Sequence, residues 1–420
     1  MKINIRQMFS YILTVLLLTV TSDVWAGQGN DRGYFVIHGI VKDKTTNKRL
    51  ENVNIYVPGM SVGTVTNAEG EFTLKIRDSL NVPEIAVSHI GYYNYRMPVR
   101  KEGAKEESIY LTPTTFVLNE IIARPDYSIT LIEEAIRRIG QNYSADPNVL
   151  TGFYRETIQK GNRYINIAEA ILDVYKNSYL DGVGHDRVRI FKGRQILGQR
   201  KNDTLAVKLS DGPNLALFLD VVKNPELILS MDMLPYYSYT REDAVFINDR
   251  LQYVVYFRPR IILPYPLYEG RFYLDSESLA ITRAEFKLDM RDREKASNLM
   301  LKRKPAGLRF KPMELSFLVT YKQQNGKSYL NYIRNQIVFK CDWKKRLFSS
   351  NYTLVTEMVV TDRADGQLTP IPYKESFRAN GVFADRVQDF SDESFWGAYN
   401  IIEPTKSLES GVQRLKKQQE

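Results

Sequence analysis

Short stretches of alternating residues, separated by turn residues, constrain the fold of this chain more than any other sequence feature. Between Tyr34 and Val41 the side chains divide into two alternating sets, which indicates a β-strand whose two faces meet different environments. Similar short segments follow as far as Leu111, and turns such as residues 67–70 contain the Asn and Gly that a hairpin requires. About seven such strands within roughly 80 residues predict a small antiparallel sandwich.

The N-terminal 26 residues have the pattern of a secretory signal peptide. Lys2 and Arg6 precede an apolar run at residues 8–20, and the small residues Val24 and Ala26 precede the expected cut. Because about 20 apolar residues are needed to span a bilayer, the run is too short for a comfortable membrane helix. An uncleaved N-terminal anchor is the alternative. We therefore expect an exported protein.

The remainder of the chain predicts a larger β-rich domain. A helix is expected at residues 126–140, because Ile129, Ile132 and Ile136 fall on one stripe. Strand signals dominate beyond it, and the predicted hairpin turns lie at residues 160–162, 248–249, 276–278 and 325–327. Successive hairpins imply a meandering antiparallel sheet that at least one helix must cover on its apolar face.

These patterns predict a mainly β protein with two folded domains. We expect a signal peptide at residues 1–26, a sandwich at 34–113, a linker at 114–127 and a β-rich domain at 128–420 that ends in an amphipathic helix. The first domain should be an Ig-like or prealbumin-like sandwich. The second should be a half-barrel-like antiparallel sheet with a few covering helices.

Four ordered segments of the first domain carry a resemblance to a known family. They are GIVKD at residues 39–43, LENVNI at 50–55, GTVTNAEGEF at 63–72 and VSHIGY at 87–92. Together, over residues 34–122, they resemble the carboxypeptidase-regulatory-like domain of Bacteroidetes envelope proteins, which also stands at the N-terminus of TonB-dependent nutrient receptors. The resemblance implies a folding and docking module, and it implies that the exported protein is located in the periplasm or is associated with the outer membrane.

Strands in the second domain resemble a different group of proteins. Residues 270–275 and 279–286 are similar to strands of LolA-like lipoprotein carriers. Those carriers curl a sheet into a half-barrel around a helix and can hold acyl chains. The resemblance implies a groove for a lipid.

Cysteine and histidine are too scarce for most metal or triad chemistry. The chain has one Cys and three His, which excludes a disulfide framework and a Cys-rich zinc site. A zinc carboxypeptidase needs a His followed three residues later by Glu, and His38, His89 and His185 all lack it. We therefore expect no catalytic residues, no cofactor and no metal site.

Positive charge gathers in two segments. Residues 291–311 hold eight Lys and Arg against two acidic residues, a local charge of +6, and a second cluster occupies residues 340–346. Such clusters attract anionic lipid headgroups, lipopolysaccharide or acidic glycans; the alternative is that they protect strand edges from aggregation. The candidate residues for an anionic-surface site are Arg291, Arg293, Lys302, Arg303, Lys304, Lys344, Lys345 and Arg346.

The sequence thus predicts a non-enzymatic protein of the cell envelope that acts in outer-membrane biogenesis or transport. Its expected partners are outer-membrane or envelope proteins, a lipid or a glycan, with peripheral membrane contact and no nucleic acid. One alternative is an accessory subunit of a TonB-dependent receptor or another outer-membrane complex. A second alternative is a hydrolase that uses carboxylates of the C-terminal domain.

Overall fold

The computed structural model describes residues 33–100, 106–114, 128–197, 212–300, 307–344, 349–366, 368–378, 383, 397 and 399–417. The predicted signal peptide and residues 115–127 of the predicted linker lie outside the described residues. Within the described residues the protein is mainly β, as the sequence predicts. No helix among them is long and apolar enough to cross a membrane.

The first domain is a sandwich of two small sheets. One sheet has the order β4-β1-β7 and the other β3-β2-β5-β6. Their strands are β1 (Tyr34–Asp43), β2 (Asn54–Tyr56), β3 (Gly63–Val65), β4 (Glu71–Arg77), β5 (Glu84–Ser88), β6 (Tyr95–Pro98) and β7 (Glu107–Leu111). Val41, Ile55, Leu74 and Ile85 fill the core between the two sheets.

One strand pair of the sandwich differs from the antiparallel arrangement that the sequence predicts. β7 lies parallel to β1. It follows β6 of the other sheet, so the chain crosses between sheets instead of turning back in a hairpin, and a crossover does not force antiparallel pairing.

The second domain is a single antiparallel sheet of ten strands with the order β10-β9-β8-β17-β16-β15-β14-β13-β12-β11. Its strands are β8 (Asn148–Lys160), β9 (Arg163–Lys176), β10 (Arg187–Leu197), β11 (Tyr237–Ile247), β12 (Arg250–Pro259), β13 (Tyr268–Asp275), β14 (Ile281–Leu288), β15 (Leu308–Gln324), β16 (Lys327–Trp343) and β17 (Ser350–Asp365). Two meanders meet where β17 pairs with β8. The four predicted hairpin turns therefore join neighbouring strands.

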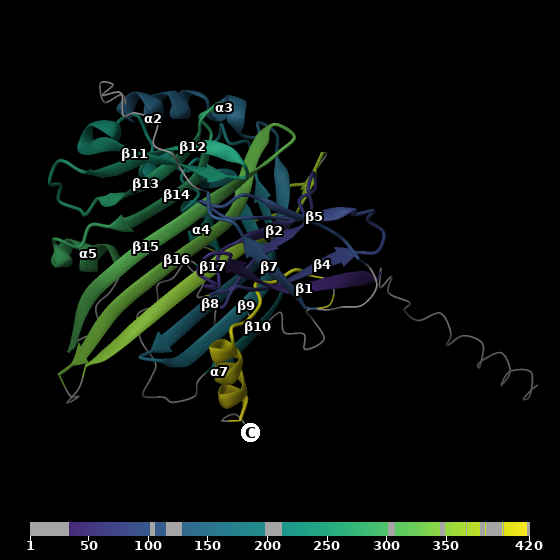
Figure 1. Cartoon of the computed structure of the whole chain (residues 1–420). Coiled ribbons are helices and arrows are strands. Elements are labelled where there is room, and N and C mark those ends of the chain that lie inside the picture. The colour runs from purple at the N-terminus through teal and green to yellow at the C-terminus, as the bar shows by residue number, and fades with distance from the viewer. Residues whose placement is uncertain are drawn as a thin grey trace, which may run out of the picture.

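The two faces of this sheet have different coverings. The inner face presents residues such as Tyr154, Phe272 and Phe317 to one large core. Helices α2 (Ser128–Arg137), α3 (Ile139–Asn142), α4 (Pro213–Phe218) and α5 (Arg293–Met300) lie against the sheet, and all four place side chains in or against this core. The outer face carries the sandwich and helix α7 (Lys406–Lys416), as Figure 1 shows.

The helix predicted at residues 126–140 is divided into α2 and α3. Ile132 is fully buried, as expected, but Ile129 lies in the first turn of α2 and is 38% exposed. The sequence analysis did not anticipate β10 or α5.

Candidate functional site

The structure describes three of the eight residues predicted for an anionic surface, namely Arg291, Arg293 and Lys344. The other five, Lys302, Arg303, Lys304, Lys345 and Arg346, lie outside the described residues. Arg291 forms an ion pair with Asp289, with 2.5 Å between nitrogen and oxygen. The backbone amide of Lys344 donates to the Gly307 carbonyl at 3.0 Å.

Strand pairing brings the two basic segments of the sequence together. At the start of β15 and the end of β16, Leu308 lies opposite Trp343 and Lys311 lies opposite Lys340. Helix α5 lies against β15 at this end, where β15 extends beyond its pairing with β14. We call this region the cationic tip; it consists of Arg291, Arg293, Lys295, Arg309, Lys311, Lys340 and Lys344.

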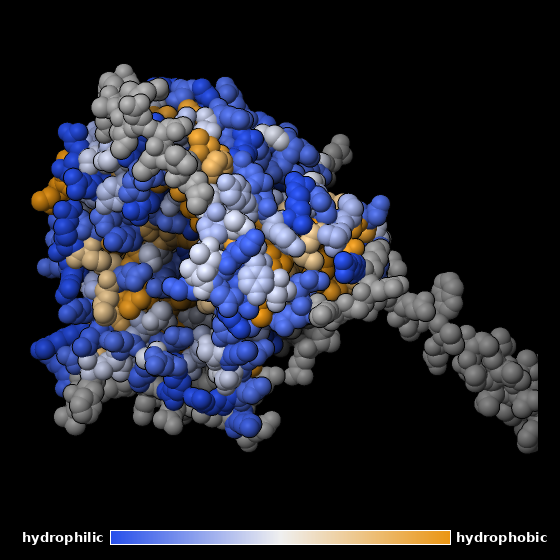
Figure 2. Space-filling view, in the orientation of Figure 1, coloured by the Kyte–Doolittle hydropathy of each residue, from blue (hydrophilic) through white to orange (hydrophobic). Residues whose placement is uncertain are grey.

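A separate groove opens on the outer face between the sandwich and the sheet. This outer groove has a volume of about 640 Å³. It adjoins a second hollow of about 780 Å³, and Tyr256, Glu269, Lys287 and Glu314 line both. In Figure 2 the face in view is hollowed beside the sandwich, over the middle of β15 and β16, with hydrophilic residues around much of the hollow and hydrophobic residues in its floor and along its lower edge.

The walls of the outer groove come from both domains. Glu51 and Asn52 of the sandwich form one side, and strands β11 to β16 supply the rest. Its charged lining residues are Glu51, Glu242, Glu269, Glu285, Glu314, Arg271, Arg283, Lys287 and Arg334. Acidic and basic residues thus occur in nearly equal number.

Cross-strand ion pairs hold these charges in place. Arg271 of β13 binds Glu242 of β11 through two hydrogen bonds of 2.6 and 3.0 Å, and these bonds are the main reason that the pKa of Arg271 is raised. Lys287 lies 3.1 Å from Glu269. Arg334 of β16 reaches across to Glu51 of the sandwich at 3.7 Å. The groove is therefore lined by fixed charges of both signs.

The sandwich is docked on the outer face by polar contacts and an apolar patch. The Ser61 hydroxyl donates to Asp362 of β17 at 2.6 Å, and Asn331 of β16 donates to the Asn54 side chain at 2.8 Å. Val65 packs against Phe153 and Val359. Ser61 lies in the loop that joins β2 to β3.

The C-terminal segment also ties the two domains together. The Asn400 side chain accepts a hydrogen bond from the Lys75 amide at 2.6 Å and donates to the Lys75 carbonyl at 3.0 Å. The Asn400 amide therefore makes the two hydrogen bonds with the Lys75 backbone that a residue of a neighbouring strand would make. Arg155 of β8 donates to the Ile402 carbonyl at 2.8 Å and to Glu169 at 2.7 Å.

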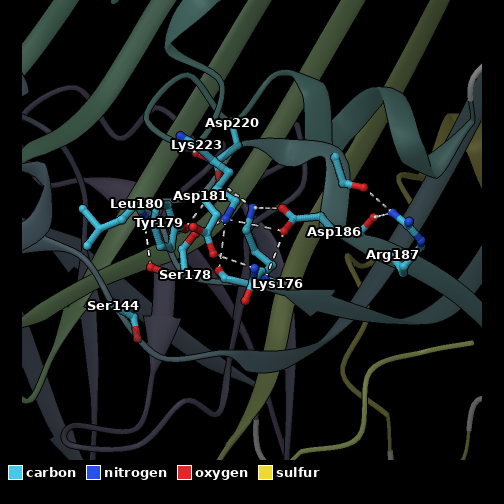
Figure 3. Close-up of polar contacts among 12 residues, drawn as sticks. Ser144, Lys176, Ser178, Tyr179, Leu180, Asp181, Asp186, Arg187, Asp220 and Lys223 are labelled. Atoms are coloured by element: carbon cyan, nitrogen blue, oxygen red, sulfur yellow. Dashed lines mark hydrogen bonds and ion pairs between the residues drawn. The ribbon is translucent and has the colours of Figure 1, made fainter.

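A buried ionic cluster lies elsewhere, around the end of β9 (Figure 3). Lys176 lies 2.5 Å from Asp220 and 3.5 Å from Asp186, and Lys223 lies 3.6 Å from Asp186. Burial lowers the pKa of Lys176, but the two aspartates raise it above its ordinary value. With two lysines and two aspartates, all fully buried, the cluster is neutral overall and anchors the segment after α4 to β9.

Polar side chains also interrupt the apolar inner face. Glu156 of β8, Thr356 of β17 and Asn335 of β16 are direct neighbours across three strands. Among the residues that the structure describes, neither polar atom of the buried Asn335 amide has a hydrogen-bond partner. Burial raises the pKa of Glu156 to about 7.

The histidines and the cysteine are dispersed. His38 contacts Thr73 at 2.8 Å, and burial is the main cause that lowers the pKa of His89 to about 4. Burial raises the pKa of Cys341 to about 11, which disfavours a reactive thiolate. Among the described residues no group of three or more His, Cys, Asp or Glu is arranged to hold a metal ion.

Comparisons with known proteins identify the first domain. Residues 37–123 match the family model of the CarboxypepD_reg-like domain, so the resemblance stated from the sequence is confirmed for this segment. The TonB-dependent receptor SusC of Bacteroides thetaiotaomicron is 30% identical over 118 residues. The match covers 27% of this chain and 10% of the length of the receptor.

The second domain has distant counterparts among solved structures. A putative outer membrane lipoprotein-sorting protein domain from Vibrio parahaemolyticus is 12% identical with a TM-score of 0.24, covering 56% of this chain and 91% of that one. A LolA superfamily protein from Nitrosomonas europaea is 12% identical with a TM-score of 0.20, covering 61% of this chain and 99% of that one. At these TM-scores the likeness is too distant to assign a function.

Sequence reasoning did not find the outer groove. One signal was present, because Glu269, Arg271, Arg283, Glu285 and Lys287 carry charge at every second position of two adjacent strands. Such alternation marks one solvated sheet face with cross-strand ion pairs. No local pattern in the sequence indicated that Glu51 lines the groove, because its ion-pair partner Arg334 lies far from it along the chain.

Proposed function

We propose that this chain is a non-enzymatic binding protein of the bacterial cell envelope, acting in outer-membrane assembly or transport. Its outer groove takes an extended segment of a partner protein. The observation that carries the proposal is a groove with walls from both domains and with fixed charges of both signs. The match of residues 37–123 to the CarboxypepD_reg-like domain supports an envelope setting.

The chemistry of the groove favours a polypeptide. Its five carboxylates and four cations nearly cancel, so it offers little net attraction to an anionic headgroup. An acyl chain requires predominantly apolar walls. A polypeptide of mixed charge can complement fixed charges of both signs and hydrogen-bond to Asn52, Ser316 and Gln336.

The hydrolase alternative finds less support. General acid–base hydrolysis uses two carboxyl groups that flank the scissile bond, one of them with a raised pKa. In the groove, Glu242 and Glu285 are bound to Arg271 and Arg283. Glu156, whose pKa burial raises to about 7, lies on the inner face of the sheet.

Charge reversal in the groove tests the proposal. In cells that encode the protein, a reversible amine crosslinker should recover a specific polypeptide with the native chain. Arg271→Glu should reduce that recovery at least tenfold, because it sets two carboxylates side by side and removes a cation from the groove wall. Arg96→Glu breaks the exposed Arg96–Glu84 pair of the sandwich and serves as the matched control.

The possible results separate the ligand classes. Recovery of the same polypeptide with Arg271→Glu at the native level would contradict the proposal. Recovery of a lipid or a glycan in place of a polypeptide, identified by mass spectrometry, would contradict it as well.

A further inference from the structure

The cationic tip has a feature that the fold alone does not account for. Lys311 of β15 lies directly opposite Lys340 of β16, on the outer face. Like charges at directly opposite positions destabilise a sheet. Among the described residues, neither lysine has a carboxylate within ion-pair distance, and Asn351 is the neighbour of Lys340 on β17. The two lysines therefore concentrate positive charge on the outer face at this end of the sheet.

The surroundings of this pair are also positive. The tip has seven cations; Asp289, Asp292, Glu294 and Asp342 lie beside them in the sequence, and Glu269 and Glu314 line the same hollow as Arg291. Three of the cations, Arg291, Lys295 and Arg309, have carboxylate neighbours at 2.5, 3.4 and 4.0 Å. The remaining surplus therefore resides on Arg293, Lys311, Lys340 and Lys344.

Apolar side chains project from the same region. Leu299 of α5 and Met313 of β15 are each 50% exposed. Met313 and Arg291 line the same hollow. Cationic residues around projecting apolar side chains are the composition of a peripheral membrane-contact surface, since the cations attract headgroups and the apolar groups enter the boundary of the acyl chains.

We infer that the cationic tip is a second binding surface of this protein, distinct from the outer groove, and that it docks on a bilayer with anionic phospholipid headgroups. Figure 1 places α5 on the side of the molecule away from the sandwich, and the beginning of β15 lies against α5 there. The inference goes beyond the proposed function and does not depend on a polypeptide partner.

One substitution separates binding from folding. Lys311→Glu places a carboxylate opposite Lys340, which replaces a like-charge pair by an ion pair and should leave the melting temperature unchanged or raise it. Binding should nevertheless weaken, because each basic residue near an anionic surface contributes about a fivefold change in partition. We expect the full chain to co-sediment with vesicles of phosphatidylcholine that contain about 30% phosphatidylglycerol, because basic residues are attracted to the negative potential of an anionic bilayer surface.

Lys311→Glu should lower this partition at least tenfold, and raising the salt concentration should do the same. The double variant Lys44→Glu and Lys48→Glu, exposed in the sandwich, is the matched control and should bind like the native chain. Leu299→Ser should weaken binding severalfold without changing its salt dependence. Inorganic phosphate at millimolar concentration should not compete, because a single anion cannot replace a charged surface.

Four results would overturn the inference. The first is binding to pure phosphatidylcholine vesicles that is as strong as binding to the anionic vesicles. The second is binding by Lys311→Glu that is as strong as binding by the native chain. The third is a loss of binding with the sandwich control as large as the loss with Lys311→Glu. The fourth is displacement from vesicles by inorganic phosphate, because it would identify a site for a free anion.

Discussion

A single carboxyl group, Glu156, gives the second domain a predictable dependence on pH. Burial raises its pKa from 4.5 to about 7, so the folded protein holds a proton that the unfolded chain releases between these values. Its contribution to the free energy of unfolding is therefore complete below pH 4.5 and is lost as the pH rises through about 7. The loss amounts to about 3 kcal/mol.

Glu156→Gln should remove this dependence while keeping the size of the side chain. We expect the variant to be more stable than the native chain at pH 8 and nearly equal to it at pH 5, as measured by urea denaturation. An unchanged difference between the two proteins across this range would contradict the assignment of the raised pKa to Glu156.

At the scale of elements, the buried cluster around the end of β9 anchors the segment that follows α4. Asp220 binds Lys176 and accepts a hydrogen bond from Tyr321 of β15 at 2.6 Å. Asp220→Asn would leave the charge of Lys176 poorly compensated in a dry interior, so we expect a loss of about 3–5 kcal/mol in the free energy of unfolding. Asp181→Asn, at an exposed position close by, should cost less than about 0.5 kcal/mol. A loss below about 1 kcal/mol for Asp220→Asn, measured by chemical denaturation, would rule out the anchoring role.

Elements defined by local signals were predictable from the sequence. The Asn325–Gly326 turn has a positive backbone φ at both residues, 52° and 78°, which Asn and Gly adopt readily, and the hairpin of β15 and β16 follows. β10 was missed because the alternation of Arg187 and Arg189 with Val188 and Ile190 is interrupted by a β-bulge between Ile190 and Lys192. The position of β10 in the sheet depends on its pairing with β9, and no local sequence pattern indicates which strands pair.

At the scale of the whole molecule, the outer groove exists only because the sandwich is docked on the sheet. Its contacts join residues far apart in sequence, such as Ser61 with Asp362 and Lys75 with Asn400. Composition and periodicity do not encode such contacts, so the sequence predicted two domains but not a site between them. The cationic tip is an intermediate case, because the sequence identified its charges and strand pairing brought them together.

Site-specific photocrosslinking in living cells tests the central claim most directly. A benzoylphenylalanine residue at Ser316, on the outer face of β15 in the groove, should give an adduct with one polypeptide of the envelope. The same residue at Lys48, exposed on the sandwich and outside the groove, should not give that adduct. If Ser316 yields no polypeptide adduct, or if both positions yield the same ones, then the outer groove is not the binding site for a partner protein.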